Sequence, residues 1–267
     1  MAKRIIKDYE AEVKYLKDWI INYFCMNGNE NTKAIIGISG GKDSTVVAYL
    51  CAAALGKERV VGVKMPCGEQ HDISYADAVI RNLGIEDYTI NIGNIVDSIH
   101  KELKLPFGHT WPKAMIYNIP PRVRMTVLYA AAAALGGRVA NTSNLSERYI
   151  GWTTKWGDSV GDFAPLADYT VEEVLEIGKV LGIPDELLYK TPEDGLTGKS
   201  DEDAIGVEYT LIDQYIRCRE KPDEFGACKR IYDMNQNSKH KRKSINLPYP
   251  MARTYWDNDE ENGDFYF

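Results

Sequence analysis

The feature that most constrains this chain is a glycine-rich turn that directly follows the short apolar run at residues 34–36. The turn reads Gly37-Ile38-Ser39-Gly40-Gly41-Lys42-Asp43-Ser44. A strand that passes through such a turn into a helix presents unpaired N–H groups and the positive end of the helix dipole, and its glycines let an anion approach the backbone. We therefore expect residues 37–44 to bind the phosphates of a nucleotide. A glycine-rich turn that binds nothing would share this outline, but would not need so many polar side chains.

The order of residues in this turn argues against the commonest phosphate-binding loop. A Walker A loop requires G-x-x-x-x-G-K-[ST]. Here Ile36 stands where the first glycine should be, and Asp43 follows Lys42 where a serine or threonine is required. The turn is therefore not the signature of a P-loop kinase or GTPase.

Composition excludes several other classes of protein. Among 267 residues, 32 Lys and Arg face 39 Asp and Glu, a net charge of −7, which argues against a dedicated nucleic-acid-binding protein. The five cysteines form no C-x-x-C pair, so a disulfide framework or zinc site is not indicated. The amino-terminal residues lack the apolar core of a signal peptide, and no apolar stretch reaches the length of a membrane span. We expect a cytoplasmic protein that binds neither nucleic acid nor membrane.

Apolar runs alternate with helical patterns over the first half of the chain. The predicted strands are 34–38, 59–65, 88–92 and 138–142, and the predicted helices are 8–25, 43–55, 73–83, 95–103 and 120–135. This alternation predicts an α/β fold: a doubly wound, mostly parallel sheet, Rossmann-like, with extra helices such as 171–181 and 207–218. Ser39, Gln70 and Asn144 each follow a predicted strand, so we expect them to border one cleft. Residues 1–267 are predicted to form a single domain, with 257–267 as a mobile acidic and aromatic tail.

Several segments resemble one family of enzymes. The turn resembles the S-G-G-x-D-S loop of N-type ATP pyrophosphatases, which cleave ATP between its α and β phosphates. Further segments are similar, in order, to those of ammonia-dependent NAD synthetases. They are K-M-P-C-G-E-Q-H-D at 64–72, N-I-P-P-R-V-R-M at 118–125, N-T-S-N-L-S-E at 141–147, T-K-W-G-D at 154–158, K-S-D-E at 199–202 and H-K-R at 240–242. Each segment is weak evidence alone, but their common order from about residue 20 to 245 is specific.

The resemblance implies an activity and its substrates. Such enzymes use ATP to adenylate the nicotinate carboxylate of deamido-NAD, release pyrophosphate, and let ammonia displace AMP to give NAD. Members that use glutamine carry an additional amidase domain, for which 267 residues leave no room, so ammonia is the expected nitrogen source. The family also implies a homodimer and Mg²⁺ as the cofactor.

The resemblance further implies roles for individual residues. Asp43 and Glu147 match magnesium ligands, and Asp43, Lys155 and Asp162 are the expected catalytic residues. ATP is expected to contact residues 37–44 and Thr142. Deamido-NAD is expected to contact five side chains, namely those of Arg122, Lys155, Asp162, His240 and Lys241. Simpler roles stay open for some of these residues, because Asp43 suits the start of any helix and the basic run at 239–243 could be a solvated face.

Two departures from the family pattern concern the ATP site. Val171 follows Thr170 where some members have a lysine, and Glu193 replaces a hydroxyl residue that contacts ATP in the family. Two other classes of function stay open, the first because other enzymes share the loop and the second because these departures favour it. The chain could be another enzyme with a pyrophosphatase loop, such as a tRNA thiolase, a tRNA-lysidine-type ligase or an amidotransferase synthetase subunit. It could also be a module that senses ATP or NAD without turnover.

Overall fold

A parallel four-stranded sheet forms the centre of the protein, as seen in a computed structural model that describes residues 6–69, 73–107, 111–189, 201–217 and 225–242. The strands are β1 (Lys33–Gly37), β2 (Val60–Lys64), β3 (Glu86–Thr89) and β4 (Gly137–Val139), in the order β3-β2-β1-β4. Every neighbouring pair is parallel. Gln70, Glu193 and the predicted tail at 257–267 lie outside the described residues.

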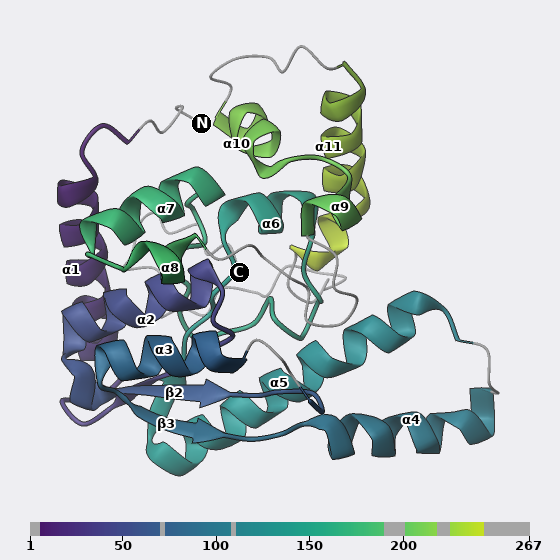
Figure 1. Ribbon diagram of the computed structural model, residues 1–267, viewed down its shortest axis with the longest axis horizontal. Coiled ribbons are helices and arrows are strands. Elements are labelled where there is room, and N and C mark those ends of the chain that lie inside the picture. Colours follow the sequence, from purple (N-terminus) through teal and green to yellow (C-terminus); the bar gives the residue numbers. More distant parts are fainter. Residues whose placement is uncertain (1–5, 70–72, 108–110, 190–200, 218–224, 243–267) are drawn as a thin grey trace, which may run out of the picture.

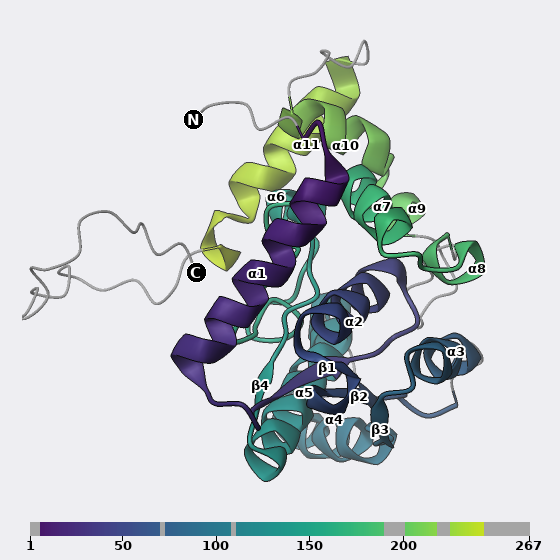
Figure 2. The same cartoon turned by 90° about the vertical axis from the view of Figure 1, so that its left-hand side faces the viewer.

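Helices cover both faces of the sheet (Figures 1 and 2). One face packs against α1 (Tyr9–Asn27), α2 (Lys42–Leu55), α3 (Ile73–Leu83) and α7 (Val171–Val180). The other face packs against α4 (Gly93–Phe107) and α5 (Lys113–Leu135), which extend together to one side in Figure 1. Ile35 and Ile36 show why β1 is apolar throughout: they are adjacent, fully buried, and belong to the two opposite cores.

The order of the strands creates a switch point beside β1. The chain proceeds from β1 to β2 and β3 on one side, and then returns to place β4 on the other side of β1. The loops that follow β1 and β4 therefore diverge at the carboxyl edge of the sheet, where open α/β proteins bind ligands. This arrangement confirms the predicted doubly wound parallel fold.

A smaller group of helices lies beyond that edge of the sheet. It contains α6 (Leu145–Ile150), α9 (Asp201–Ile205), α10 (Tyr209–Arg217), α11 (Phe225–Asn237) and the 3₁₀ turn η2 (Lys239–Lys241). Buried residues such as Ile150, Ile212 and Ile231 give this group its own apolar cluster. The short helix α8 (Asp185–Leu188) follows α7, and a 3₁₀ turn, η1 (Lys57–Arg59), precedes β2. In the described part of the chain, no helix combines the length and apolarity needed to cross a bilayer.

Most predicted elements are present, but the expected start of the long helix at Pro120 is wrong. Helix α5 begins at Lys113, so Pro120 and Pro121 lie inside it. Two interior prolines remove the N–H groups that would bond the carbonyls of Ile116 and Tyr117. Both of these residues are 40% exposed, so this turn of α5 lies at the surface of the protein. The third strand was also misplaced: β3 begins at Glu86 rather than at residue 88.

Candidate active site

The turn after β1 is held in shape by contacts among its own residues. Gly40 has a φ of 78°, and a Cβ atom there would lie 2.8 Å from the backbone nitrogen of Ala76. Only glycine fits, because both the backbone conformation and the space exclude a side chain. The Ser39 hydroxyl accepts a hydrogen bond from the Gly41 N–H at 3.2 Å, and the Ser44 hydroxyl donates to the Gly41 carbonyl at 3.1 Å. The serines of the motif thus fix the shape of the turn itself.

Helix α2 begins within this motif, at Lys42, and no side chain caps its amino terminus. Gly41 is the N-cap residue and provides no side-chain acceptor for the first N–H groups of the helix. An uncapped amino terminus of a 14-residue helix combines free donors with the positive end of the dipole. The Lys42 ammonium lies 3.0 Å from a carboxylate oxygen of Asp43 and 5.5 Å from the centre of the Tyr209 ring. This end of α2 is therefore suited to hold a polyphosphate.

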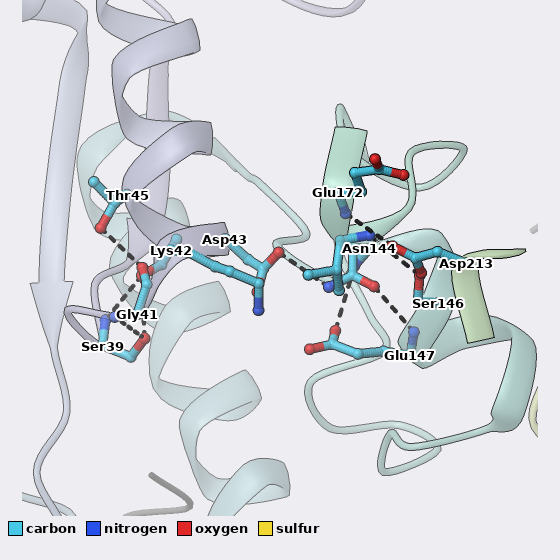
Figure 3. Close-up of polar contacts among 12 residues, drawn as sticks. Ser39, Gly41, Lys42, Asp43, Thr45, Asn144, Ser146, Glu147, Glu172 and Asp213 are labelled. Atoms are coloured by element: carbon cyan, nitrogen blue, oxygen red, sulfur yellow. Dashed lines mark hydrogen bonds and ion pairs between the residues drawn. The ribbon is translucent and has the colours of Figure 1, made fainter. Parts of the chain in front are cut away.

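Asn144 connects this turn to the loop that follows β4 (Figure 3). Its side-chain amide donates to Asp43 Oδ1 at 3.0 Å, while its Oδ1 accepts from the Glu147 N–H at 3.0 Å. The Glu147 carboxylate in turn accepts from the Asn144 N–H at 3.3 Å, which completes a capping box at the start of α6. Asn144 is fully buried. It therefore fixes two acidic side chains, 104 positions apart, on either side of itself across the switch point.

The donor set formed by Asp43 and Glu147 fits a magnesium ion that is held partly by a substrate. The described residues contain no cluster of three or more His, Cys, Asp or Glu side chains able to hold a metal by themselves. Magnesium does not require one, because it is usually bound through one or two carboxylates together with substrate phosphates and water. Asp43 and Glu147, which both bond to Asn144 beside the uncapped start of α2, are carboxylates of the kind that this pattern requires.

A second group of predicted residues meets on the loop that follows α6. Arg122, from α5, donates through Nε to the carbonyl of Lys155 at 3.3 Å. The Lys155 ammonium donates to the carbonyl of His240 at 2.7 Å. Three of the five predicted dinucleotide-binding residues, from α5, the 151–163 loop and η2, are thus in direct contact. Each of these contacts runs from a side chain to a backbone carbonyl, and together they join α5, the loop after α6 and η2.

Lys241, the fourth of these residues, binds the protein backbone. Its ammonium donates to the carbonyls of Gly151 at 2.8 Å and Thr153 at 2.7 Å. The neighbouring Arg242 donates to the carbonyl of Tyr149 at 2.9 Å. Arg242 thus satisfies a carbonyl in the last turn of α6, where a helix has no internal partner for it, and Lys241 satisfies carbonyls of the residues that follow the helix. Burial lowers the pKa of Lys241.

Asp162 and Thr142 lie nearer to the sheet edge. Asp162 accepts from the Val139 N–H at 2.7 Å and from the Tyr129 hydroxyl at 3.3 Å. Burial, followed by the charge of Asp162, raises the pKa of Tyr129 to about 12, so this phenol remains a hydrogen-bond donor. Thr142 is half-buried directly after β4, between Asn141 and Ser143, which both bind the carbonyl of Asp158. Asp162 therefore faces β4 and α5, whereas Lys155 faces η2.

Comparison with known proteins identifies the relatives of this site. The family model described as NAD synthase matches residues 12–245, a range that includes Asp43, Asn144 and Glu147 as well as the loop after α6 and η2. The chain belongs to the NAD synthase family. This confirms the resemblance seen in the sequence motifs. It also makes the chain a ligase that forms a carbon–nitrogen bond.

Individual relatives agree with the family assignment. An NH(3)-dependent NAD(+) synthetase of Pyrococcus furiosus is 39% identical over 80% of this chain and 88% of the relative. A protein of the same name from Archaeoglobus fulgidus is 35% identical over 92% of this chain and 98% of the relative. A solved structure of NMN synthetase from Francisella tularensis is 32% identical, with a TM-score of 0.82 over 91% of this chain and 99% of that one.

The sequence did not identify the residues that hold the site in place. Asp213, on α10, accepts from the Ser146 hydroxyl at 2.5 Å and from the Glu172 N–H at 2.8 Å (Figure 3). It thereby ties α6, which carries Glu147, to the start of α7. Asn144 was predicted only to border the cleft, although its spacing from Glu147 matches a capping box and could have revealed helix α6.

Buried Asp213 is expected to make stability fall as pH rises. Burial is the main cause that raises its pKa from 3.8 to about 6, and the charges of Glu172 and Glu173 add to this effect. Between about pH 4 and pH 6 the folded protein therefore holds a proton that the unfolded chain has lost. The contribution of Asp213 to the free energy of unfolding should decline by about 3 kcal/mol over that interval.

Chemical denaturation of the wild type and of Asp213→Asn at several pH values measures this contribution. The variant cannot titrate at this position, so the wild type should lose stability relative to it as pH rises from 4 to 6. A difference between the two proteins that stays constant over that interval would contradict the prediction.

Proposed function

We propose that this chain converts deamido-NAD into NAD with ammonia, at the expense of ATP. The observation that carries the proposal is the link from the uncapped start of α2 through Asp43 and Asn144 to Glu147. It joins a phosphate-binding turn to a pair of carboxylates at the switch point of the sheet. The cationic contacts of Arg122 and Lys155 lie on the adjoining loop.

The reaction proceeds in two steps under this proposal. An oxygen of the nicotinate carboxylate attacks the α-phosphorus of ATP, and the bond to the β-phosphate oxygen breaks to release pyrophosphate. Ammonia then attacks the carbonyl carbon of the adenylate, AMP leaves with the electrons of the broken C–O bond, and a proton is lost from nitrogen. The chain needs no nucleophile of its own, because both attacking atoms belong to substrates.

The residues of the site each have a task in this scheme. The turn at 37–44 and the first N–H groups of α2 would bind the triphosphate, with Thr142 on the adenosine side. Asp43 and Glu147 would hold Mg²⁺, which when bound neutralises charge on the phosphates. The dinucleotide would be held by Arg122, Lys155, Asp162, His240 and Lys241. Lys155 and Lys241 donate to backbone carbonyls, which orient their ammonium groups within the site.

A second candidate substrate is nicotinate mononucleotide, whose amide is NMN. The Francisella tularensis structure named NMN synthetase covers nearly the same length as this chain and matches it with a TM-score of 0.82. The two substrates contain the same nicotinate carboxylate, so the adenylation and amidation steps are identical. They differ only in whether the site also holds an adenosine group.

One assay distinguishes these candidates. Purified protein is mixed with ATP and Mg²⁺, with either deamido-NAD or nicotinate mononucleotide, and with either ammonium or glutamine. We expect NAD and pyrophosphate from deamido-NAD with ammonium, and a much lower rate with glutamine. Faster turnover of the mononucleotide would assign the second candidate, and pyrophosphate without either amide would mean that adenylation occurs but amidation fails. Formation of neither product would overturn the proposal in favour of a nucleotide-sensing module.

The expected assembly and location extend this proposal. We infer a single catalytic domain that works as a homodimer in the cytoplasm, as the family resemblance implies. Light scattering coupled to gel filtration would give the mass of the particle, for which the homodimer predicts twice the chain mass of 30.1 kDa.

A further inference from the structure

Trp156 has a backbone conformation that its side chain disfavours. Its φ is 63°, and among the described residues it is the only non-glycine residue with a positive φ. A bulky residue in this region is strained, because its Cβ atom crowds the following carbonyl oxygen. The indole is also 48% exposed, so burial of the ring does not compensate for the strain. Neither burial of the ring nor the backbone preference of tryptophan therefore explains why this residue type stands at position 156.

The neighbours of Trp156 impose this conformation. The Thr154 N–H donates to Asp158 at 2.7 Å, and the Gly157 N–H donates to the Thr154 carbonyl at 2.9 Å, so the loop closes on both sides of the tryptophan. The Thr154 hydroxyl donates to Asn118 on α5 at 2.8 Å. A Cβ atom at Gly157 would lie only 3.0 Å from Pro121, so the loop presses closely on α5. The loop thus presents whatever side chain stands at position 156 outward in a fixed direction.

The indole that is presented lies beside the cations of the site. The Lys155 ammonium is 5.2 Å from the centre of the Trp156 ring. The same ammonium donates to the carbonyl of His240, and Arg122 donates to the carbonyl of Lys155. A flat aromatic surface next to fixed cations is the combination that holds a base and its phosphate together.

We propose that Trp156 stacks against a heteroaromatic ring of the nicotinate nucleotide, and that its left-handed backbone exists to present the indole for this contact. The inference rests on the proposed function, since it assigns a specificity-determining residue to the same substrate. Two rings of deamido-NAD share the required chemistry, the pyridine of nicotinate and the adenine at the other end. Strain of this kind is found where a residue serves a ligand.

The test measures binding of deamido-NAD in the absence of ATP, by titration calorimetry, so it does not depend on turnover. Trp156→Ala should weaken binding by roughly tenfold or more, as expected for loss of one stacking contact. Trp156→Phe keeps an aromatic face and should stay within about threefold of the wild type. ATP binding should be unchanged in both variants. Tyr15→Ala, at another exposed aromatic residue on α1, is the control and should bind both nucleotides as the wild type does.

Trp156→Gly separates the backbone from the side chain. Glycine adopts a positive φ without strain, so this variant should melt at a higher temperature than Trp156→Ala while binding deamido-NAD equally weakly. Nicotinate mononucleotide distinguishes the two rings. If Trp156→Ala weakens its binding as well, the indole stacks on the pyridine, and if only deamido-NAD is affected, the indole stacks on adenine.

Three results would overturn the inference. They are unchanged binding of deamido-NAD to Trp156→Ala, an equal loss of ATP binding, and a change of oligomeric mass in that variant, which would place the indole in a contact between subunits. Failure of the proposed function is recognised separately. In that case the wild type itself binds neither nicotinate nucleotide or forms no amide from it, whereas failure of this inference alone leaves a wild type that does both.

Discussion

Replacing Asp43 with asparagine is expected to lower turnover by roughly 10²- to 10³-fold, comparable to the loss of one fixed electrostatic contact at a reacting phosphate. The substitution keeps an oxygen that can accept the hydrogen bond from the Asn144 amide, so the position of Asn144 should not change. What disappears is the negative charge beside the start of α2. Steady-state rates of NAD and pyrophosphate formation, measured over a range of Mg²⁺ concentrations, provide the test.

A second variant at Asp43 separates loss of the charge from loss of the contact with Asn144, and a variant elsewhere is the control. Asp43→Ala removes both the charge and the contact with Asn144, and should be at least as inactive as Asp43→Asn. If Asp43 only positioned Asn144, the asparagine variant would keep wild-type turnover while the alanine variant lost it. Asp18→Asn, at an exposed carboxylate on α1 that pairs with Lys14, is the matched control and should leave the rate unchanged.

Replacing Gly151 with alanine is expected to lower the free energy of unfolding by about 3 kcal/mol or more. Gly151 has a φ of 73°, and an added Cβ atom would lie 2.0 Å from the Cβ atom of Ser238. A Cβ atom cannot rotate away, so the backbone that leads into η2 must move. Lys241 would then lose its contact with the Gly151 carbonyl, and binding of deamido-NAD should weaken together with stability.

Gly182→Ala is the matched control for the steric part of this loss. Gly182 has a similar φ of 71°, but an added Cβ atom would meet nothing within 4 Å. That variant carries only the cost of a left-handed alanine, about 1–2 kcal/mol. Chemical denaturation of both variants measures the difference. Equal losses would mean that the contact with Ser238 contributes nothing.

The elements that the sequence predicts correctly are those whose own residues contain a clear signal. The turn at 37–44 contains its own glycines and serines, and α3 has a clear apolar stripe that ends before Gly84, so both are predicted correctly. Pro120 misled the prediction because proline is common in the first turn of a helix. Its place inside α5 depends on the seven helical residues before it and on the surface position of the turn whose two carbonyls lose their partners. The presence of a proline alone reveals neither.

The candidate site is harder to predict because its contacts join distant segments. Asp43 and Asn144 are 101 residues apart, so no spacing rule could pair them, although Asp43 lies in the glycine-rich turn and Asn144 follows a predicted strand. The hydrogen bonds from Lys155 and Lys241 go to backbone carbonyls. Every residue has such a carbonyl, so the sequence cannot indicate which one a side chain binds. The sequence therefore indicated the residue types of the site, and the fold determined which of them meet.

The contacts of η2 have a consequence for how this protein is made. The carboxyl end of α6 and the loop after it depend on donors from Lys241 and Arg242, which are translated about 90 residues later. Until residue 242 has left the ribosome, the carbonyls at 149–153 lack these partners. A chain that stalls earlier would therefore have a complete sheet and phosphate turn, yet remain inactive and open to proteases at its unfinished site. The site at the end of α6 can therefore be completed only after the η2 segment has been synthesised.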